Sequence, residues 1–181
     1  MRYPNREVAK IFVERHGRRE AKSYSEHLHC NDGILYSYST PIGIWSWKLR
    51  NTYSEQFDTI GPLIDFPRAM IFLTEHRYSQ TTGCHESHLR YSGNGQVVEI
   101  PEEIELLMQS PAKFIVSVKE KIQFCKAKLA KARKEYTRER WQNMAKSYDR
   151  LNGLFAPIAF LETMRMPERR TDVNLDFASV S

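Results

Sequence analysis

The chain has 181 residues, of which 41% are hydrophobic and 12% aromatic, which supplies enough apolar material for a core and excludes a wholly disordered chain. No apolar run approaches the roughly 18 residues that cross a bilayer, and the N-terminal residues lack an apolar leader. We therefore expect a cytoplasmic protein without a membrane partner. The formal charge of +5 is concentrated: residues 113–150 hold twelve Lys or Arg against four Asp or Glu, and the remainder holds fifteen against eighteen.

The first half of the chain is predicted to form helices around a short sheet. Residues 5–16 place apolar side chains at helical spacing and end before Gly17, which predicts an amphipathic helix. Positions 31–33 read Asn-Asp-Gly, a hairpin-turn signal because these residues tolerate positive φ, so residues 26–47 are predicted to be a β-hairpin. Pro41 is expected to interrupt this run or to place it at a sheet edge.

A loop, two short strands and a helix are expected next. Proline and glycine punctuate residues 51–68, which predicts a loop. The apolar run at residues 69–74 predicts a strand, with residues 78–82 as its candidate partner. A short helix is expected over residues 83–91, and the Ser-Gly-Asn-Gly sequence that follows is expected to end it.

The second half of the chain is predicted to be helical. Pro101 suits the first turn of one helix, and Pro111 the first turn of a much longer one. Two apolar seams follow: Ile115, Val118, Ile122, Cys125, Leu129, Ala132 and Tyr136, then Trp141, Met144, Tyr148, Leu151 and Phe155. The phase slips between the seams, which indicates either a change of supercoil or a break between two helices. Pro157 is expected to limit the run, and the apolar residues up to Met166 to pack back on it.

These elements predict an α+β protein with a small, mostly antiparallel sheet and flanking helices. The expected α+β domain covers residues 1–98, and a helical region with a long basic helix or helical hairpin covers residues 99–166. Residues 167–181 are polar and are expected to form a disordered tail.

One polar segment, YSQTTGCHESHLRY at residues 78–91, is the densest cluster of hydrogen-bonding and titratable side chains. If a helix begins near Thr82, its free backbone N–H groups, neighbouring hydroxyls and imidazoles form a cradle for a phosphate or carboxylate. The candidate anion-binding or ligand-binding residues are Tyr36, Tyr38, Thr81, Thr82, His85, His88 and Arg90. In the structural alternative, Thr82 caps the helix and the histidines are satisfied surface or core residues.

Two stretches, LYSYSTPIGIW at residues 35–45 and YSQTTGCHESHLR at residues 78–90, resemble a family of small uncharacterised bacteriophage and plasmid proteins. That family pairs a YSYGTPIA-like hairpin with a later YSxTTSxHQSxVR-like segment and often begins with a short helix like residues 6–12. The resemblance covers roughly residues 6–91 and implies a phage or mobile-element origin without an established activity. The matching positions are Tyr36, Tyr38, Thr40, Pro41, Ser79, Thr81, Thr82, His85, Ser87 and Arg90. Two positions depart from the pattern, Ser39 in place of Gly and Gly83-Cys84 in place of a Ser-basic pair.

Histidines and cysteines also raise the hypotheses of zinc binding and of catalysis. The candidate zinc ligands are His27, His29, Cys30, Cys84, His85 and His88. Their spacing matches no recognised zinc pattern, so neither a metal nor another cofactor is predicted. The odd number of cysteines, three, argues against a disulfide framework. The enzymatic alternative is a small nuclease or hydrolase that uses His85 or His88 as a general acid or base, or a Cys84 nucleophile.

The long helical segment carries a dense positive charge. Its basic-arm residues are Lys126, Lys131, Arg133, Lys134, Arg138 and Arg140, with Lys128 in the same run. Most lie outside the apolar seam, which favours contact with phosphates or acidic protein, although a solvated helix face has the same pattern. The seam over residues 115–155 needs a partner, which is either a second helix of the same chain or a second copy in a homodimer.

The leading hypothesis is a non-enzymatic, phage-type interaction protein with an anionic partner: nucleic acid, a nucleotide or an acidic host-protein surface. An inhibitor of a host defence system would fit a phage origin, and this hypothesis rests on the resemblance to phage proteins alone. The two alternatives are the nuclease or hydrolase and a structural protein that oligomerises through its helical region.

Overall fold

The computed structural model describes residues 1–57, 69–75 and 79–165. Its strands form one mixed sheet whose spatial order follows the chain order. They are β1 (Arg2–Tyr3), β2 (Ala21–Ser23), β3 (Leu28–Asn31), β4 (Ile34–Ser37), β5 (Thr40–Trp45), β6 (Ile71–Thr74) and β7 (Val97–Ile100). The outermost pairs, β1 with β2 and β6 with β7, are parallel, and the pairs between them are antiparallel. The prediction of an α+β protein with a mostly antiparallel sheet is therefore confirmed.

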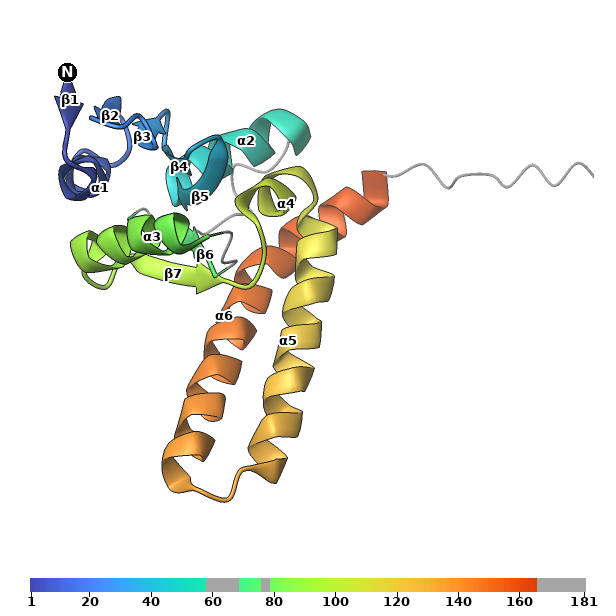
Figure 1. Ribbon diagram of the computed structural model, residues 1–181. Helices are drawn as coiled ribbons and strands as arrows, with labels where there is room; N and C mark the ends of the chain where they lie inside the picture. The colour runs from blue at the N-terminus through green and yellow to red at the C-terminus, as the bar shows by residue number, and fades with distance from the viewer. Residues whose placement is uncertain (58–68, 76–78, 166–181) are drawn as a thin grey trace, which may run out of the picture.

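Helices pack on both faces of this sheet (Figure 1). They are α1 (Asn5–Glu14), α2 (Ser46–Phe57), α3 (Gln80–Gly93), α4 (Ile104–Gln109), α5 (Pro111–Lys131) and α6 (Glu135–Arg165). One buried cluster joins α1 and α3 to side chains of β2 to β6. The other joins α2, α4, α5 and α6 to alternate side chains of β4 to β7. Since successive residues of a strand point to opposite faces, the sheet separates two apolar cores.

The predicted hairpin forms, but its second strand is shorter than expected. Asp32 and Gly33 have positive φ and make the two-residue turn between β3 and β4, as the Asp-Gly signal predicts. A second turn then starts β5, where Pro41 lies at an irregularity in the β4–β5 register. β6 pairs with β5 only from Gly43 onward. Pro41 therefore lies outside this pairing, and its lack of an N–H costs the β5–β6 ladder no hydrogen bond.

Two predictions for the middle of the chain are wrong, and part of each falls outside the described residues. Residues 51–57 belong to α2, not to a loop, because Leu49, Tyr53 and Phe57 pack in the core at helical spacing; residues 58–68 lie outside the described part. The predicted strand at residues 78–82, of which Tyr78 lies outside the described residues, is replaced from Ser79 onward by the start of α3, whose N-cap Ser79 accepts a hydrogen bond from the Thr82 N–H. The partners of β6 are instead β5 and the unpredicted β7, within which the expected domain boundary at residue 98 falls.

The basic segment forms an antiparallel pair of helices that extends away from the sheet (Figure 1). The α5 helix ends at Lys131 and α6 begins at Glu135, so the slip in the apolar seam marks a break between two helices. Tyr136, expected at the end of the first seam, is 75% exposed. Pro157 does not end the run, since it lies inside α6 with its side chain exposed. The carbonyl that its ring leaves without a donor belongs to Gly153, which is also exposed to solvent.

The end of α6 is tied to the start of α5 by Glu162. Its carboxylate accepts hydrogen bonds from the Ser110 hydroxyl and from the Ala112 N–H, both at 2.7 Å. These donors lie at the N-terminus of α5, where the helix dipole favours a negative charge. The apolar stretch beyond Pro157 thus continues α6 along α5 and does not fold back, while the expected tail at 167–181 lies outside the described residues. None of the described helices has the length and apolar composition that crossing a membrane requires.

Candidate functional site

The helical pair of α5 and α6 presents the basic residues to solvent. Lys126, Lys128, Lys131, Arg133, Lys134, Arg138 and Arg140 are all exposed and lie around the turn that joins the helices. The ion pairs found in the described part of the chain join residues of the sheet and its nearest helices. None of them includes a Lys or Arg of residues 113–150, so the acidic side chains of this segment do not pair with its cations. The solvent-exposed surface of the helical pair therefore has a concentrated positive potential.

The polar segment predicted as an anion cradle forms, from Gln80 onward, nearly all of α3, and one of its faces is buried. Thr82 is 3% exposed and His85 is 1% exposed. The His85 ring lies between Ser37, whose Oγ is 2.9 Å from Nδ1, and Asn5, whose Nδ2 is 3.1 Å from Nε2. Because the Asn5 amide donates, Nε2 accepts and Nδ1–H donates to Ser37. The Ser37 hydroxyl in turn lies 3.1 Å from Thr82 Oγ1, so α1, β4 and α3 share one buried hydrogen-bond network.

This geometry does not suit Ser37 or His85 to hydrolysis. Ser37 is 1% exposed, which closes it to a substrate. Both nitrogens of His85 already have hydrogen-bond partners, and in the tautomer that Asn5 favours the imidazole donates to the hydroxyl and cannot take its proton. The network therefore acts as a structural connection between α1, the sheet and α3.

The two predicted tyrosines stack on histidines: Tyr36 of β4 on His29 of β3, and Tyr38, just after β4, on His27, just before β3. The rings of Tyr36 and His29 are 4.9 Å apart and nearly parallel, and those of Tyr38 and His27 are 4.4 Å apart. Tyr38 has a φ of +57°, in the left-handed region that residues other than glycine seldom adopt. Its ring centroid lies 6.5 Å from that of His85, so Tyr38 covers the outer side of the buried network.

The remaining predicted residues lie on other parts of α3. Thr81 is exposed and His88 is half-buried. The guanidinium of Arg90 makes ion pairs with Glu86, at 3.6 Å, and with Glu99 of β7. Arg90 therefore faces carboxylates, whereas Thr82 and His85 face the hydroxyl of Ser37, and the structure divides the predicted cradle between two faces of α3.

Acidification is expected to weaken the fold through His85. Burial, followed by the neighbouring His88 and His27, lowers the pKa of His85 from its ordinary value of 6.5. The folded state then binds fewer protons than the unfolded state, so stability is present above pH 6.5 and falls as the pH drops toward the folded-state pKa. Urea unfolding between about pH 7.5 and about pH 5 should show this loss, and His85→Gln should flatten the slope. An equally steep slope in the variant would contradict the assignment, because another group, such as His29, whose pKa burial also lowers, would then account for it.

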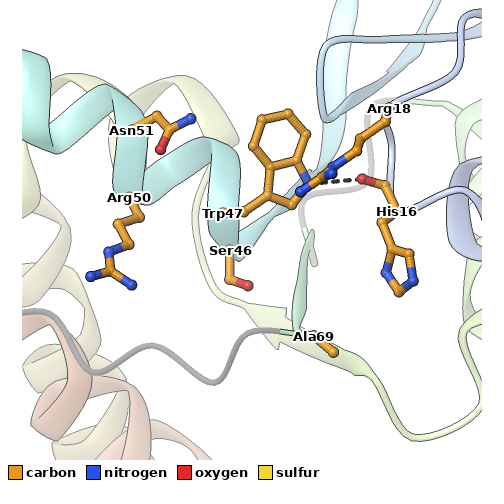
Figure 2. A pocket seen from close by; sticks show the side chains of 7 residues that line it. All are labelled: His16, Arg18, Ser46, Trp47, Arg50, Asn51 and Ala69. Atoms are coloured by element: carbon orange, nitrogen blue, oxygen red, sulfur yellow. Dashed lines mark hydrogen bonds between the residues drawn. The ribbon is translucent and has the colours of Figure 1, made fainter.

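One pocket was not anticipated from the sequence. It encloses about 630 Å³ and is lined by His16, Arg18, Ser46, Trp47, Arg50, Asn51 and Ala69. Figure 2 shows the side chains of His16, Ser46 and Arg50 directed to the same side of Trp47. The indole N–H of Trp47 donates to the His16 carbonyl at 2.7 Å, and the Arg18 guanidinium lies 5.8 Å from the indole ring. No periodic or motif signal marks these residues, because the fold brings them together from the segment after α1, from the first half of α2 and from the chain before β6.

Among the described residues, no three side chains of His, Cys, Asp or Glu lie close enough together to hold a metal ion. The described structure therefore gives the zinc hypothesis no support. Cys30 is buried and donates to the Arg19 carbonyl, whereas Cys84 is exposed. Comparisons with protein families, with curated proteins and with solved structures find no significant match to this chain.

Proposed function

We propose that this protein is a non-enzymatic interaction protein that binds an anionic partner through the helical pair of α5 and α6. The partner classes with suitable chemistry are nucleic acid, a nucleotide and an acidic protein surface. The observation that carries the proposal is the exposure of the basic-arm residues, which the ion pairs of the described chain leave unneutralised. A role against a host defence system rests only on the resemblance to phage proteins.

The shape of the helical pair supports binding to an extended polyanion. The helical pair projects from the sheet (Figure 1), and its basic-arm residues are exposed, so a flexible anionic chain reaches them without contact with the rest of the protein. Each phosphate that a lysine or arginine neutralises releases counterions, which makes the binding steeply dependent on salt. Five pockets of the described chain have linings that include none of the basic-arm residues, so none of these five would enclose a small anion on the arm.

Neutralising four basic residues next to the turn tests the proposal. The variant replaces Lys131, Arg133, Lys134 and Arg138 by glutamine. Binding to fluorescent oligonucleotides and to heparin should weaken by roughly 100-fold or more at low salt, and the slope of log affinity against log salt should fall by about three. Fluorescence anisotropy over a salt series measures both quantities.

A matched control removes four exposed positive charges from the other side of the fold. It replaces Arg6, Lys10, Arg15 and Lys22, all exposed, by glutamine. Both variants lower the net charge equally, so a general charge effect would weaken both alike. Unchanged binding in the variant of residues 131–138, or equal losses in the two variants, would overturn the proposal that α5 and α6 form the binding surface.

A further inference from the structure

Aromatic side chains lie exposed among the cations of the helical pair. The Phe124 side chain of α5 is 51% exposed. A large apolar side chain at a solvated helix position is not explained by packing in the core. Its ring meets the half-buried Trp141 of α6 edge to face, with centroids 5.7 Å apart and an interplanar angle of 79°. Tyr136 at the start of α6 is 75% exposed. The helical pair therefore carries an aromatic pair in which Phe124 is exposed and Trp141 is partly accessible to solvent.

Cations surround this aromatic pair. The Lys128 ammonium lies 5.2 Å from the Phe124 centroid, and the Arg140 guanidinium lies 5.8 Å from the Trp141 centroid. Lys121, Phe124, Lys128 and Lys131 follow one another at intervals of three and four residues, which places them along one face of α5. One face of α5 thus forms a stripe in which Phe124 lies among three lysines, and Trp141 and Arg140 of α6 lie next to it.

Resting on the function proposed above, we propose that this stripe binds single-stranded nucleic acid, with unpaired bases stacked on Phe124 and Trp141 and phosphates held by the flanking lysines and arginines. A flexible single strand offers both chemistries together: a π-face on every base and a charge on every phosphate. A duplex keeps its base faces stacked inside, so it engages the cations alone. An acidic peptide likewise pairs with the cations and leaves the rings exposed to water.

Replacing the rings by leucine tests the stacking without a change of charge. Phe124→Leu and Trp141→Leu should each weaken binding to a single-stranded oligonucleotide by about 10-fold, because one stacked base is worth about 1–3 kcal/mol. Binding to heparin, which has no bases, should stay unchanged. Phe160→Leu is the matched control. Phe160 is 62% exposed and lies on α6, like Trp141, but far from the turn and from the basic arm.

The outcomes separate this inference from the function on which it rests. If neither leucine variant affects single-strand binding while the variant of residues 131–138 abolishes it, the stacking is overturned and the proposed function stands. If the wild-type protein binds neither oligonucleotides nor heparin, the proposed function fails and this inference fails with it. If light scattering shows a dimer that Phe124→Leu converts to a monomer, the rings form an interface between two copies and the inference is overturned. Phe124→Leu alone carries the test if Trp141→Leu is shown by circular dichroism to lose its helices.

Discussion

Replacing Phe155 by alanine is expected to lower the free energy of unfolding by about 3–5 kcal/mol, because the change leaves a cavity in a packed core. Phe155 of α6 is fully buried, and its ring meets Phe72 of β6 at 5.4 Å and Phe114 of α5 at 5.1 Å, both close to edge to face. One side chain thus joins the sheet to both long helices. Chemical denaturation followed by circular dichroism measures the loss.

The position of the cavity also predicts which part of the protein loosens. Hydrogen exchange should increase most in α5 and α6, since the Phe155 ring contacts both Phe114 of α5 and Phe72 of β6. Phe160→Ala is the control on the same helix: this side chain is 62% exposed, and its loss should cost about 0.5 kcal/mol or less. A loss below about 1 kcal/mol in Phe155→Ala would contradict the idea that this aromatic cluster attaches the helical pair to the sheet.

Replacing Gly17 by alanine is expected to cost about 3 kcal/mol or more, because strain and crowding act together. Gly17 has a φ of +68°, and an added Cβ would lie 2.5 Å from Cδ1 of Trp45 and 2.7 Å from the Cα of Gly33. The backbone has no room to move, since the Gly17 carbonyl accepts the Gly33 N–H at 3.0 Å and the Gly17 N–H donates to Phe12 at 2.8 Å. Thermal and chemical unfolding give the size of the effect.

A second glycine provides the control for that substitution. Gly153 lies within α6, and an added Cβ there meets nothing within 4 Å. Gly153→Ala should therefore stabilise the protein by about 0.5–1 kcal/mol, since alanine restricts the unfolded chain and favours the helix. If Gly17→Ala and Gly153→Ala have the same effect on the free energy of unfolding, the close approach of the segment after α1 to the β3–β4 turn is refuted. The variant also reports on the pocket of Figure 2, because Gly17 follows the His16 carbonyl that holds Trp47.

The elements that the sequence predicted well are those governed by short-range signals. The first helix, the Asp-Gly turn and the start of the long helix at Pro111 each depend on residues a few positions apart. Pro157 misled the prediction because a proline's cost to a helix depends on whether solvent or another group satisfies the freed carbonyl. Strand β7 was missed because the Gly-Asn-Gly turn before it does not indicate which strand follows or where it pairs.

The sequence by itself determined where the charge is gathered: basic residues at non-seam positions of a helix face outward wherever that helix packs, so the positive rod follows from local spacing. Only the tertiary structure decided what the histidine motif does. Asn5 and Ser37, which satisfy both nitrogens of His85, lie 80 and 48 residues away in the chain, and no local pattern brings them to α3. Local spacing fixes which side of a helix a residue occupies, whereas burial depends on contacts between distant segments, and those form only when the whole chain folds.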